Sequence, residues 1–247
     1  MNPSSIVKHC DEKNFHQDNL YCGYDGKLID QFSEKMFDAD YWQQQHAILG
    51  TAQGRGTTYF VKHEQQEWVL KHYYRGGLIG RVLHDQYWFT GYKNTRAAQE
   101  FQLMKLMEKL DLPAPKAVAY RIQKTAFIYR SDILTQRIPA AQDLVGILAK
   151  KTIPDRLWRK IGACIKQFHH HGIYHHDLNI HNILIDDHNK VWLIDFDRGE
   201  QRTPKQEWQQ QNIERLLRSF HKENNKIANF HWHADNWQAL MEGYLSQ

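Results

Sequence analysis

Asp177, Asn182 and Asp195 stand among apolar, strand-forming residues, and their types suit phosphate chemistry. Asp177 and Asn182 bracket a short loop, and Asp195 ends the strand-like run VWLID. Oxygen ligands from Asn182 and Asp195, together with water and phosphate oxygens, would complete the octahedron that Mg²⁺ prefers. Asp177, which such a metal does not need, could accept a proton from a hydroxyl group. The segment therefore offers a general base beside a metal site.

The elements around these residues must bring them together. The runs NILID and VWLID flank the polar turn DHNK and predict a hairpin, which would bring Asn182 and Asp195 to the same end. Apolar residues at helical spacing predict a helix over Pro154–His171 before the loop, and further helices over residues 205–222 and 234–245. The second half of the chain is therefore expected to be mainly helical.

Histidines crowd the same region: His169, His170, His171, His175, His176 and His181. A transition-metal centre is one interpretation, but no acid or thiol completes a regular ligand spacing. We expect His175 to support the loop by hydrogen bonding. His169 to His171 should end a helix, where a partly protonated imidazole suits the dipole.

The first half of the chain is richer in strand patterns. Alternation in TTYFV and EWVLKHYY predicts an antiparallel meander, and VAYRI, AFIYR and DILTQRI predict further strands. A short helix is predicted over residues 37–45 and a longer one over Thr95–Leu110. Glu100 falls within the apolar stripe of the longer helix, where an acid is costly unless a positive group meets it.

The motif HHDLNIHN, residues 175–182, resembles the protein-kinase catalytic loop H-R-D-L-x-x-x-N, and Asp195-Phe196-Asp197 resembles D-F-G. The resemblance implies Asp177 as the catalytic base, with Asn182 and Asp195 as Mg²⁺ ligands. It also implies a glycine-rich turn over the ATP phosphates, for which the candidates are Gly50, Gly54 and Gly56. Lys71 in WVLK resembles the strand lysine that touches the α- and β-phosphates, and Glu100 would orient it.

This resemblance implies an α+β, bilobal, protein-kinase-like fold. We predict a small β-rich N-terminal lobe with one helix over residues 1–138, carrying the nucleotide-binding sheet. A mainly helical C-terminal lobe over residues 139–247 would carry the catalytic loop and the metal site. The 247-residue length suits two small lobes, and 41% hydrophobic with 24% charged residues predicts a globular protein.

Basic residues gather with aromatic residues between Lys71 and Arg96, where Asp85 is the single acid. Such a surface suits an anionic, amphipathic partner, such as a charged lipid headgroup or a nucleic acid. We predict that this surface binds the phosphate acceptor or the membrane surface through Arg75, Arg81, Lys93 and Arg96. A formal net charge of only +4 argues against nucleic acid as the partner. Three widely spaced cysteines, an N-terminus without a signal-like apolar region, and no long apolar run predict a cytoplasmic location.

Departures from the protein-kinase pattern point to a smaller acceptor. His176 stands where an arginine would read a phosphorylated loop, Asp197 replaces the glycine, and no A-P-E follows. The chain instead resembles bacterial 3-deoxy-D-manno-octulosonic acid (Kdo) kinases of the lipopolysaccharide kinase family. The segments that carry this resemblance include LKHYYRGGLIGRV, HHDLNIHNILID, LIDFDRG and NIERLLRSFHK.

The resemblance implies transfer of the ATP γ-phosphate to the 4-hydroxyl of Kdo on a lipid A precursor, at the cytoplasmic face of the inner membrane. It implies ATP and Mg²⁺ as cofactors and a peripheral association with an anionic membrane surface. A heptose kinase of the lipopolysaccharide core is an alternative, as is a nucleotide-binding pseudokinase or interaction module.

Overall fold

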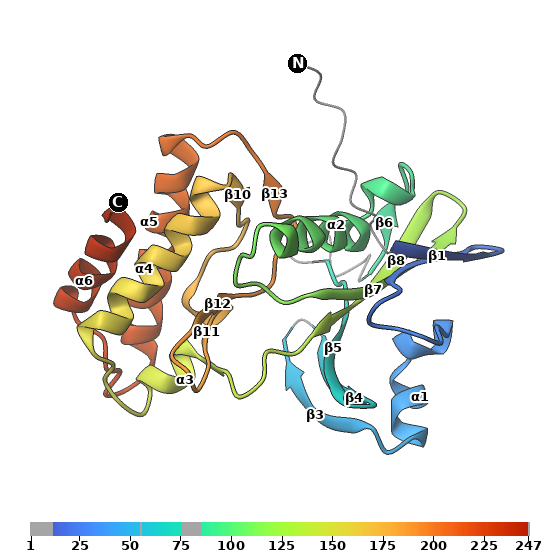
Figure 1. Cartoon of the computed structure of the whole chain (residues 1–247), viewed down its shortest axis with the longest axis horizontal. Helices are drawn as coiled ribbons and strands as arrows, with labels where there is room; N and C mark the ends of the chain where they lie inside the picture. The colour runs from blue at the N-terminus through green and yellow to red at the C-terminus, as the bar shows by residue number, and fades with distance from the viewer. Residues whose placement is uncertain (1–11, 55, 76–84, 247) are drawn as a thin grey trace. The chain divides into compact units, whose positions relative to one another are not determined.

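The computed structural model describes residues 12–54, 56–75 and 85–246 (Figure 1). The chain divides into two compact units. The first comprises residues 1–101 and 117–136, and the second comprises residues 102–116 and 137–247. Strands dominate the first unit and helices the second, which confirms the predicted α+β class.

The first unit is built on one antiparallel sheet of eight strands. Its order is β1 (Glu12–Gln17), β2 (Leu20–Asp25), β7 (Ala117–Thr125), β8 (Ile128–Gln136), β5 (Gln66–His72), β4 (Thr57–His63) and β3 (Ile48–Gln53), with β6 (Tyr87–Trp88) paired to β8. The predicted meander is confirmed as β3–β4–β5.

The prediction of separate strands in AFIYR and DILTQRI was wrong, because β8 runs through both without a break. In the sequence, the polar residues Ser131 and Asp132 stand between the two apolar runs. In the structure Asp132 is buried, and the Nε of Arg121 on β7 donates to its carboxylate at 2.8 Å. A buried charge that is paired in this way can remain inside a strand.

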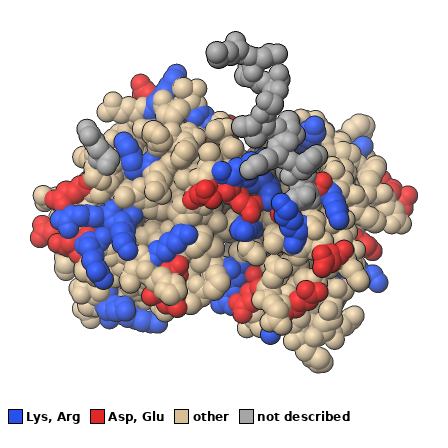
Figure 2. Space-filling model, in the orientation of Figure 1, with Lys and Arg blue, Asp and Glu red and all other residues tan. Residues whose placement is uncertain are grey.

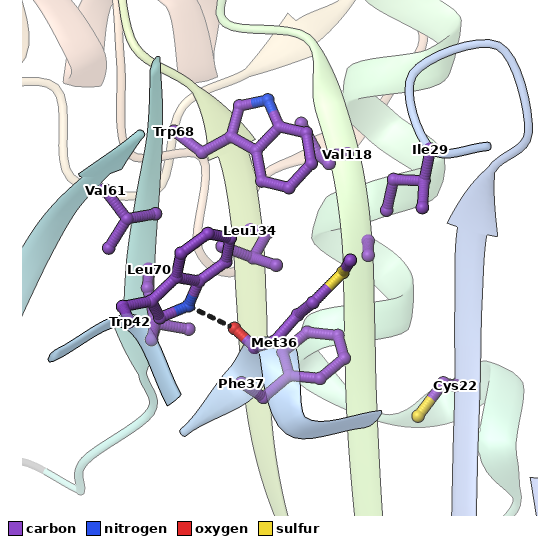
Figure 3. Close-up of a cluster of buried hydrophobic side chains, with 11 residues drawn as sticks. Cys22, Ile29, Met36, Phe37, Trp42, Val61, Trp68, Leu70, Val118 and Leu134 are labelled. Atoms are coloured by element: carbon purple, nitrogen blue, oxygen red, sulfur yellow. Dashed lines mark hydrogen bonds between the residues drawn. The ribbon is translucent and has the colours of Figure 1, made fainter. Parts of the chain in front are cut away.

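A cluster of buried aromatic and aliphatic side chains covers one part of this sheet (Figure 3). The short helices η1 (Glu34–Phe37) and α1 (Ala39–Gln44) contribute Met36, Phe37 and Trp42 to it. The indole N–H of Trp42 donates to the Met36 carbonyl at 2.7 Å, as Figure 3 shows. The Trp42 ring meets Trp68 of β5 edge to face at 6.1 Å. These contacts hold α1, which is too short to be stable on its own.

The longer predicted helix is α2 (Arg96–Lys109), preceded by the short helix η3 (Tyr92–Asn94). Its apolar stripe is buried as expected, with Ala97, Phe101, Met104 and Met107 each at most 2% exposed. The Phe101 ring lies 5.0 Å from that of Tyr120 on β7. Contact between these two rings ties the first turns of α2 to the sheet.

The second unit contains α3 (Leu144–Leu148), α4 (Asp155–His170), α5 (Gln206–Lys226) and α6 (Ala234–Leu245). Its short strands are β9 (Gln142–Asp143), β10 (Ile173–Tyr174), β11 (Ile183–Ile185), β12 (Val191–Leu193) and β13 (Glu200–Gln201), with the single turn η4 (Ile180–Asn182). Helices α4 and α6 lie side by side (Figure 1). A Cβ on Gly162 would stand 1.9 Å from the Leu240 carbonyl oxygen, so only glycine permits this approach.

In the described part of the chain, none of the helices combines the length and the hydropathy needed to span a membrane.

Candidate functional site

The predicted hairpin in the second unit is present as β11 and β12. Ile183 pairs with Leu193, and the Ile194 N–H donates to the Asn182 carbonyl at 3.0 Å. Asn182 and Asp195 therefore flank the same end of the hairpin, as the sequence predicted. Asp195 has a φ of 61°, in the left-handed region. Aspartate tolerates this conformation better than most residues, and such backbones are common at functional sites.

The loop that carries Asp177 is fixed through its backbone. The side-chain amides of Asn179 and Asn182 both donate to the Asp177 carbonyl oxygen, at 2.9 and 3.0 Å. The Asp177 side chain itself is 57% exposed. The result is an accessible carboxylate on an immobilised backbone, which is the arrangement that a general base for a bound hydroxyl requires.

His175 supports this loop by hydrogen bonding, as predicted. Its Nε2–H donates to the Ile194 carbonyl at 2.9 Å, and its Nδ1 accepts from the Asp177 N–H at 3.2 Å. This pattern fixes the neutral tautomer. Burial lowers the pKa of His175, more than offsetting the hydrogen bond to Ile194 and the nearby carboxylates, which raise it. One neutral ring thus joins the backbone of the loop to the strand end that precedes Asp195.

Helix α5 holds the loop from another side, through polar residues that the sequence analysis did not single out. The Ile180 N–H donates to Ser219 Oγ at 3.0 Å, and the His175 N–H donates to Asn212 Oδ1 at 3.4 Å. His181 Nε2 lies 3.3 Å from the carboxylate of Glu223, which is buried. The regular spacing of polar residues along one face of α5 was the available signal.

Glu223 stays charged despite its burial. Burial alone raises its pKa, but the hydrogen bond from His181 and the electrostatic interactions with His181 and Lys226 outweigh that effect, so the pKa is lowered. A buried carboxylate with these neighbours is stable only where they remain in place. Glu223 therefore anchors His181, and with it the single turn η4 that leads to Asn182.

The three predicted residues line one pocket of about 430 Å³ within the second unit. The pocket is lined by Asp177, Asn182 and Asp195. It is also lined by three basic side chains of α5, those of Arg215, Arg218 and Lys222. The distance from Nη1 of Arg215 to the carboxylate of Asp177 is 3.6 Å. The volume falls within the range of roughly 300–1,000 Å³ that is usual for small-molecule sites.

Lys71 and Glu100 lie together in the first unit. Lys71 Nζ is 3.6 Å from Glu100 Oε2, and Glu100 is only 4% exposed. The Tyr73 hydroxyl donates to the same carboxylate oxygen at 2.5 Å, and Lys71 Nζ lies 5.0 Å from the centre of the Tyr73 ring. The acid in the apolar stripe of α2 therefore has both a cation and a hydroxyl beside it.

The candidate glycines differ in how strongly the structure requires them. A Cβ on Gly56 would stand 1.9 Å from the ring of Tyr74, whereas one on Gly50 would make an ordinary contact with Phe60 at 3.7 Å. The Gly54 N–H donates to the Gly56 carbonyl at 3.0 Å and forms a tight turn between β3 and β4. Of the three, Gly56 is the one at which a Cβ would displace a neighbouring side chain, whereas Gly50 and Gly54 have room for a side chain.

The predicted docking residues have different surroundings. Arg96 donates to the Tyr87 hydroxyl at 2.6 Å, and its guanidinium lies 5.0 Å from that ring. Arg75 donates to the Gln86 carbonyl and lies 4.8 Å from the same ring. Lys93 is exposed, and Arg81 lies outside the described residues. Figure 2 shows basic and acidic side chains interspersed over the face that it presents.

The prediction for His169, His170 and His171 was wrong about the charge of one of them. They do end α4, with His171 as its C-cap, but His169 is 1% exposed and burial lowers its pKa to about 4. It is therefore neutral and cannot serve the helix dipole as a cation. Its Nδ1 lies 2.7 Å from the Tyr244 hydroxyl. Among the described residues no three His, Cys, Asp or Glu side chains form a metal-ligating group.

Comparisons with known proteins point to one family. Residues 39–244 match the model described as the lipopolysaccharide kinase (Kdo/WaaP) family. The 3-deoxy-D-manno-octulosonic acid kinase of Vibrio parahaemolyticus is 44% identical, over 93% of this chain and 96% of the relative. The Haemophilus influenzae protein of the same name is 40% identical, over 94% and 99%. A solved granulovirus kinase, PK-1 of Cydia pomonella, covers 66% of this chain and 55% of its own with a TM-score of 0.43 and 16% identity.

Proposed function

Because this chain belongs to the lipopolysaccharide kinase (Kdo/WaaP) family, we propose that it transfers the γ-phosphate of ATP to the 4-hydroxyl of Kdo on a lipid A precursor. Membership makes it a phosphotransferase that acts on a hydroxyl group. The name shared by the relatives from Vibrio and Haemophilus supports Kdo as the acceptor sugar. The observation that carries the proposal is the exposed Asp177 carboxylate, on a fixed backbone, in a pocket with Asn182 and Asp195.

Asp177 is proposed to orient the acceptor hydroxyl and to take its proton. The backbone hydrogen bonds from Asn179 and Asn182 keep the carboxylate in position, so little order has to be gained when the acceptor binds. Nη1 of Arg215 lies 3.6 Å from the same carboxylate, on the side of the pocket that α5 lines.

Asn182 and Asp195 fit the requirements of a Mg²⁺ site. Both would present oxygen, the ligand atom that Mg²⁺ prefers. The Asn182 amide nitrogen already donates to the Asp177 carbonyl, which leaves its side-chain oxygen as the atom to offer a cation. When bound, Mg²⁺ would neutralise charge on the phosphate oxygens during transfer. This role for the two residues is part of the proposal.

The ATP phosphates are proposed to bind residues of the first unit. Lys71 would contact the α- and β-phosphates, and Glu100 would orient its ammonium group from the buried side, as their 3.6 Å separation permits. The turn containing Gly50, Gly54 and Gly56 would cover the phosphates with backbone N–H groups. The lobe boundary between residues 138 and 139 is part of the same proposal.

The proposed membrane role depends on the positive charge of four basic residues. Arg75, Arg81, Lys93 and Arg96 would dock the anionic acceptor or the surface of the inner membrane from the cytoplasmic side. Arg75 and Arg96 both lie against the Tyr87 ring, so their guanidinium groups are held in a fixed arrangement. Arg75→Ala should raise the acceptor KM in a salt-dependent manner and leave the ATP KM unchanged. An acceptor KM that does not respond would reject this docking role.

An acceptor panel tests the proposed function. Purified protein, ATP and Mg²⁺ are combined with a Kdo-bearing lipid A precursor, with a core lipid in which heptose alone carries a free hydroxyl, or with no acceptor, and ADP formation is measured. We expect turnover with the Kdo acceptor only. Turnover with heptose alone would identify a heptose kinase, and ADP formation that is independent of acceptor would reject both.

A substitution of Asp177 tests its catalytic role. Asp177→Asn should lower kcat by about 10²–10⁴-fold, the usual contribution of a general base. Asp187→Asn is the matched control, because this carboxylate is 62% exposed and does not line the pocket. Full activity in Asp177→Asn would contradict the assignment of the base.

A further inference from the structure

A basic face of α5 lies in the wall of the Asp177 pocket. Arg215, Arg218 and Lys222 follow the helical spacing that sets side chains on one face, and all three are exposed. Arg215 lies beside Asp177 at 3.6 Å. Within residues 12–54, 56–75 and 85–246, neither Arg218 nor Lys222 forms an ion pair with a carboxylate. Two cations thus line the pocket without an ion pair to any carboxylate of the described residues.

The fold does not require this charge. Helix α5 is held in the second unit by its buried residues Ile213, Leu216 and Phe220. Its polar anchors to the catalytic loop are Ser219 and Glu223, whose partners are Ile180 and His181. Arg218 and Lys222 take no part in either set of contacts. Like charges that face one pocket repel each other, so their presence points to an anionic ligand that binds between them.

Glu223 does not neutralise this pair, although it also lines the pocket. Its carboxylate is buried and lies 3.3 Å from His181 and 3.6 Å from Lys226. In the proposed function, Asp177 accepts the proton of the acceptor hydroxyl and Asp195 binds the metal. The positive charge of Arg218 and Lys222 therefore remains available to a ligand.

We propose that Arg218 and Lys222 form a subsite for the carboxylate of the acceptor sugar. This inference rests on the proposed function, in which the acceptor is an octulosonic acid and so carries a hydroxyl and a carboxylate on one ring. The hydroxyl would meet Asp177 while the carboxylate meets the basic face of α5. Arginine can hold a carboxylate through two parallel N–H donors, which fixes the orientation of the ring as well as its position.

The subsite gives the protein a way to select an acidic sugar. A neutral sugar would leave the two cations without a partner in the pocket and would bind less well, because charge complementarity chooses between ligands of similar size. Phosphates of the lipid part could also attract these cations. The two sources of negative charge are separable, because each can be removed from the acceptor by chemistry that spares the other.

The experiment combines variants with modified acceptors. Arg218→Gln and Lys222→Gln are compared with the wild-type protein and with Lys150→Gln, a control that removes an exposed cation of the same unit outside the pocket. Each is assayed with the native Kdo acceptor, with its carboxyl methyl ester, and with an acceptor lacking the lipid phosphates. Circular dichroism and the ATP KM verify that the variants are folded and bind nucleotide.

We expect each pocket variant to raise the KM for the native acceptor about ten-fold, as the loss of one charge-assisted hydrogen bond implies, and Lys150→Gln to leave it unchanged. The methyl ester should raise the wild-type KM similarly and cause little further loss in the variants. Removing the lipid phosphates should not change the effect of the variants.

Different failures have different meanings. Unchanged acceptor KM values in Arg218→Gln and Lys222→Gln, in a wild-type protein that phosphorylates Kdo, would overturn the subsite alone. A variant effect that disappears with the lipid phosphates instead of the carboxylate would also overturn it. No transfer by the wild-type protein to any Kdo acceptor would overturn the proposed function and the subsite with it.

Discussion

His175→Phe should separate the positioning of the catalytic base from nucleotide binding. The substitution keeps a ring in a site that is 2% exposed and packs against Phe196 at a centroid distance of 4.8 Å. It removes the bond donated to the Ile194 carbonyl at 2.9 Å and the one accepted from the Asp177 N–H at 3.2 Å. Two hydrogen bonds at about 1 kcal/mol each, plus the cost of leaving their partners unsatisfied, give a loss of roughly 2–4 kcal/mol.

Urea unfolding measures this loss, and steady-state kinetics at a temperature where the variant is folded measure the consequence for catalysis. We expect kcat to fall about 10–100-fold, since a displacement of about 1 Å at the base has an effect of this order, while the ATP KM changes little. His170→Phe, at an exposed position near the end of α4, is the control and should change both quantities little. A destabilised His175→Phe with wild-type kcat would refute the positioning role, and unchanged stability would refute the hydrogen-bond reasoning itself.

Tyr73→Phe removes the hydroxyl that donates to buried Glu100 at 2.5 Å; we expect the free energy of unfolding to fall by about 1.5–3 kcal/mol and the ATP KM to rise, and unchanged urea curves would contradict this. Because burial lowers the pKa of His169 from 6.5 to about 4, the unfolded chain takes up a proton there before the folded one does. Its stability contribution is therefore complete above pH 6.5 and is lost as the pH falls towards 4, by up to roughly 3 kcal/mol. His169→Phe should flatten the pH dependence of unfolding in that window, and an equally steep profile would reject the assignment. Gly162→Ala would place a Cβ 1.9 Å from the Leu240 carbonyl oxygen; calorimetry should register a loss of about 1–3 kcal/mol or more, whereas a neutral effect would mean that α4 and α6 can separate freely.

Local patterns predicted the helices that carry a regular apolar stripe. The helix predicted over Thr95–Leu110 is observed over Arg96–Lys109, because its apolar stripe is regular and Pro113 follows its end. Strands β1 and β2 were not predicted, since their polar and tyrosine-rich sequence gives no clear alternation. The helix predicted to end at residue 222 extends to Lys226, because Glu223 is buried there by tertiary contacts that no local pattern reveals.

The residues of the candidate site also differ in how far the sequence alone could place them. Asn182 and Asp195 could be brought together from sequence because a hairpin links them. The contact of Arg215 with Asp177 and that of Ser219 with Ile180 depend on how α5 packs, which residue spacing alone does not determine. The charge state of His169 also followed from burial and could not be inferred from its place at a helix end.

The most direct measurement is the position of the new phosphate on the acceptor. Wild-type protein is incubated with ATP, Mg²⁺ and a Kdo-bearing lipid A precursor, and the product is examined by phosphorus–proton correlation NMR. We predict one new phosphomonoester, coupled to the proton on carbon 4 of Kdo. A phosphate on another sugar, on the lipid, or on no acceptor at all would contradict the proposed function.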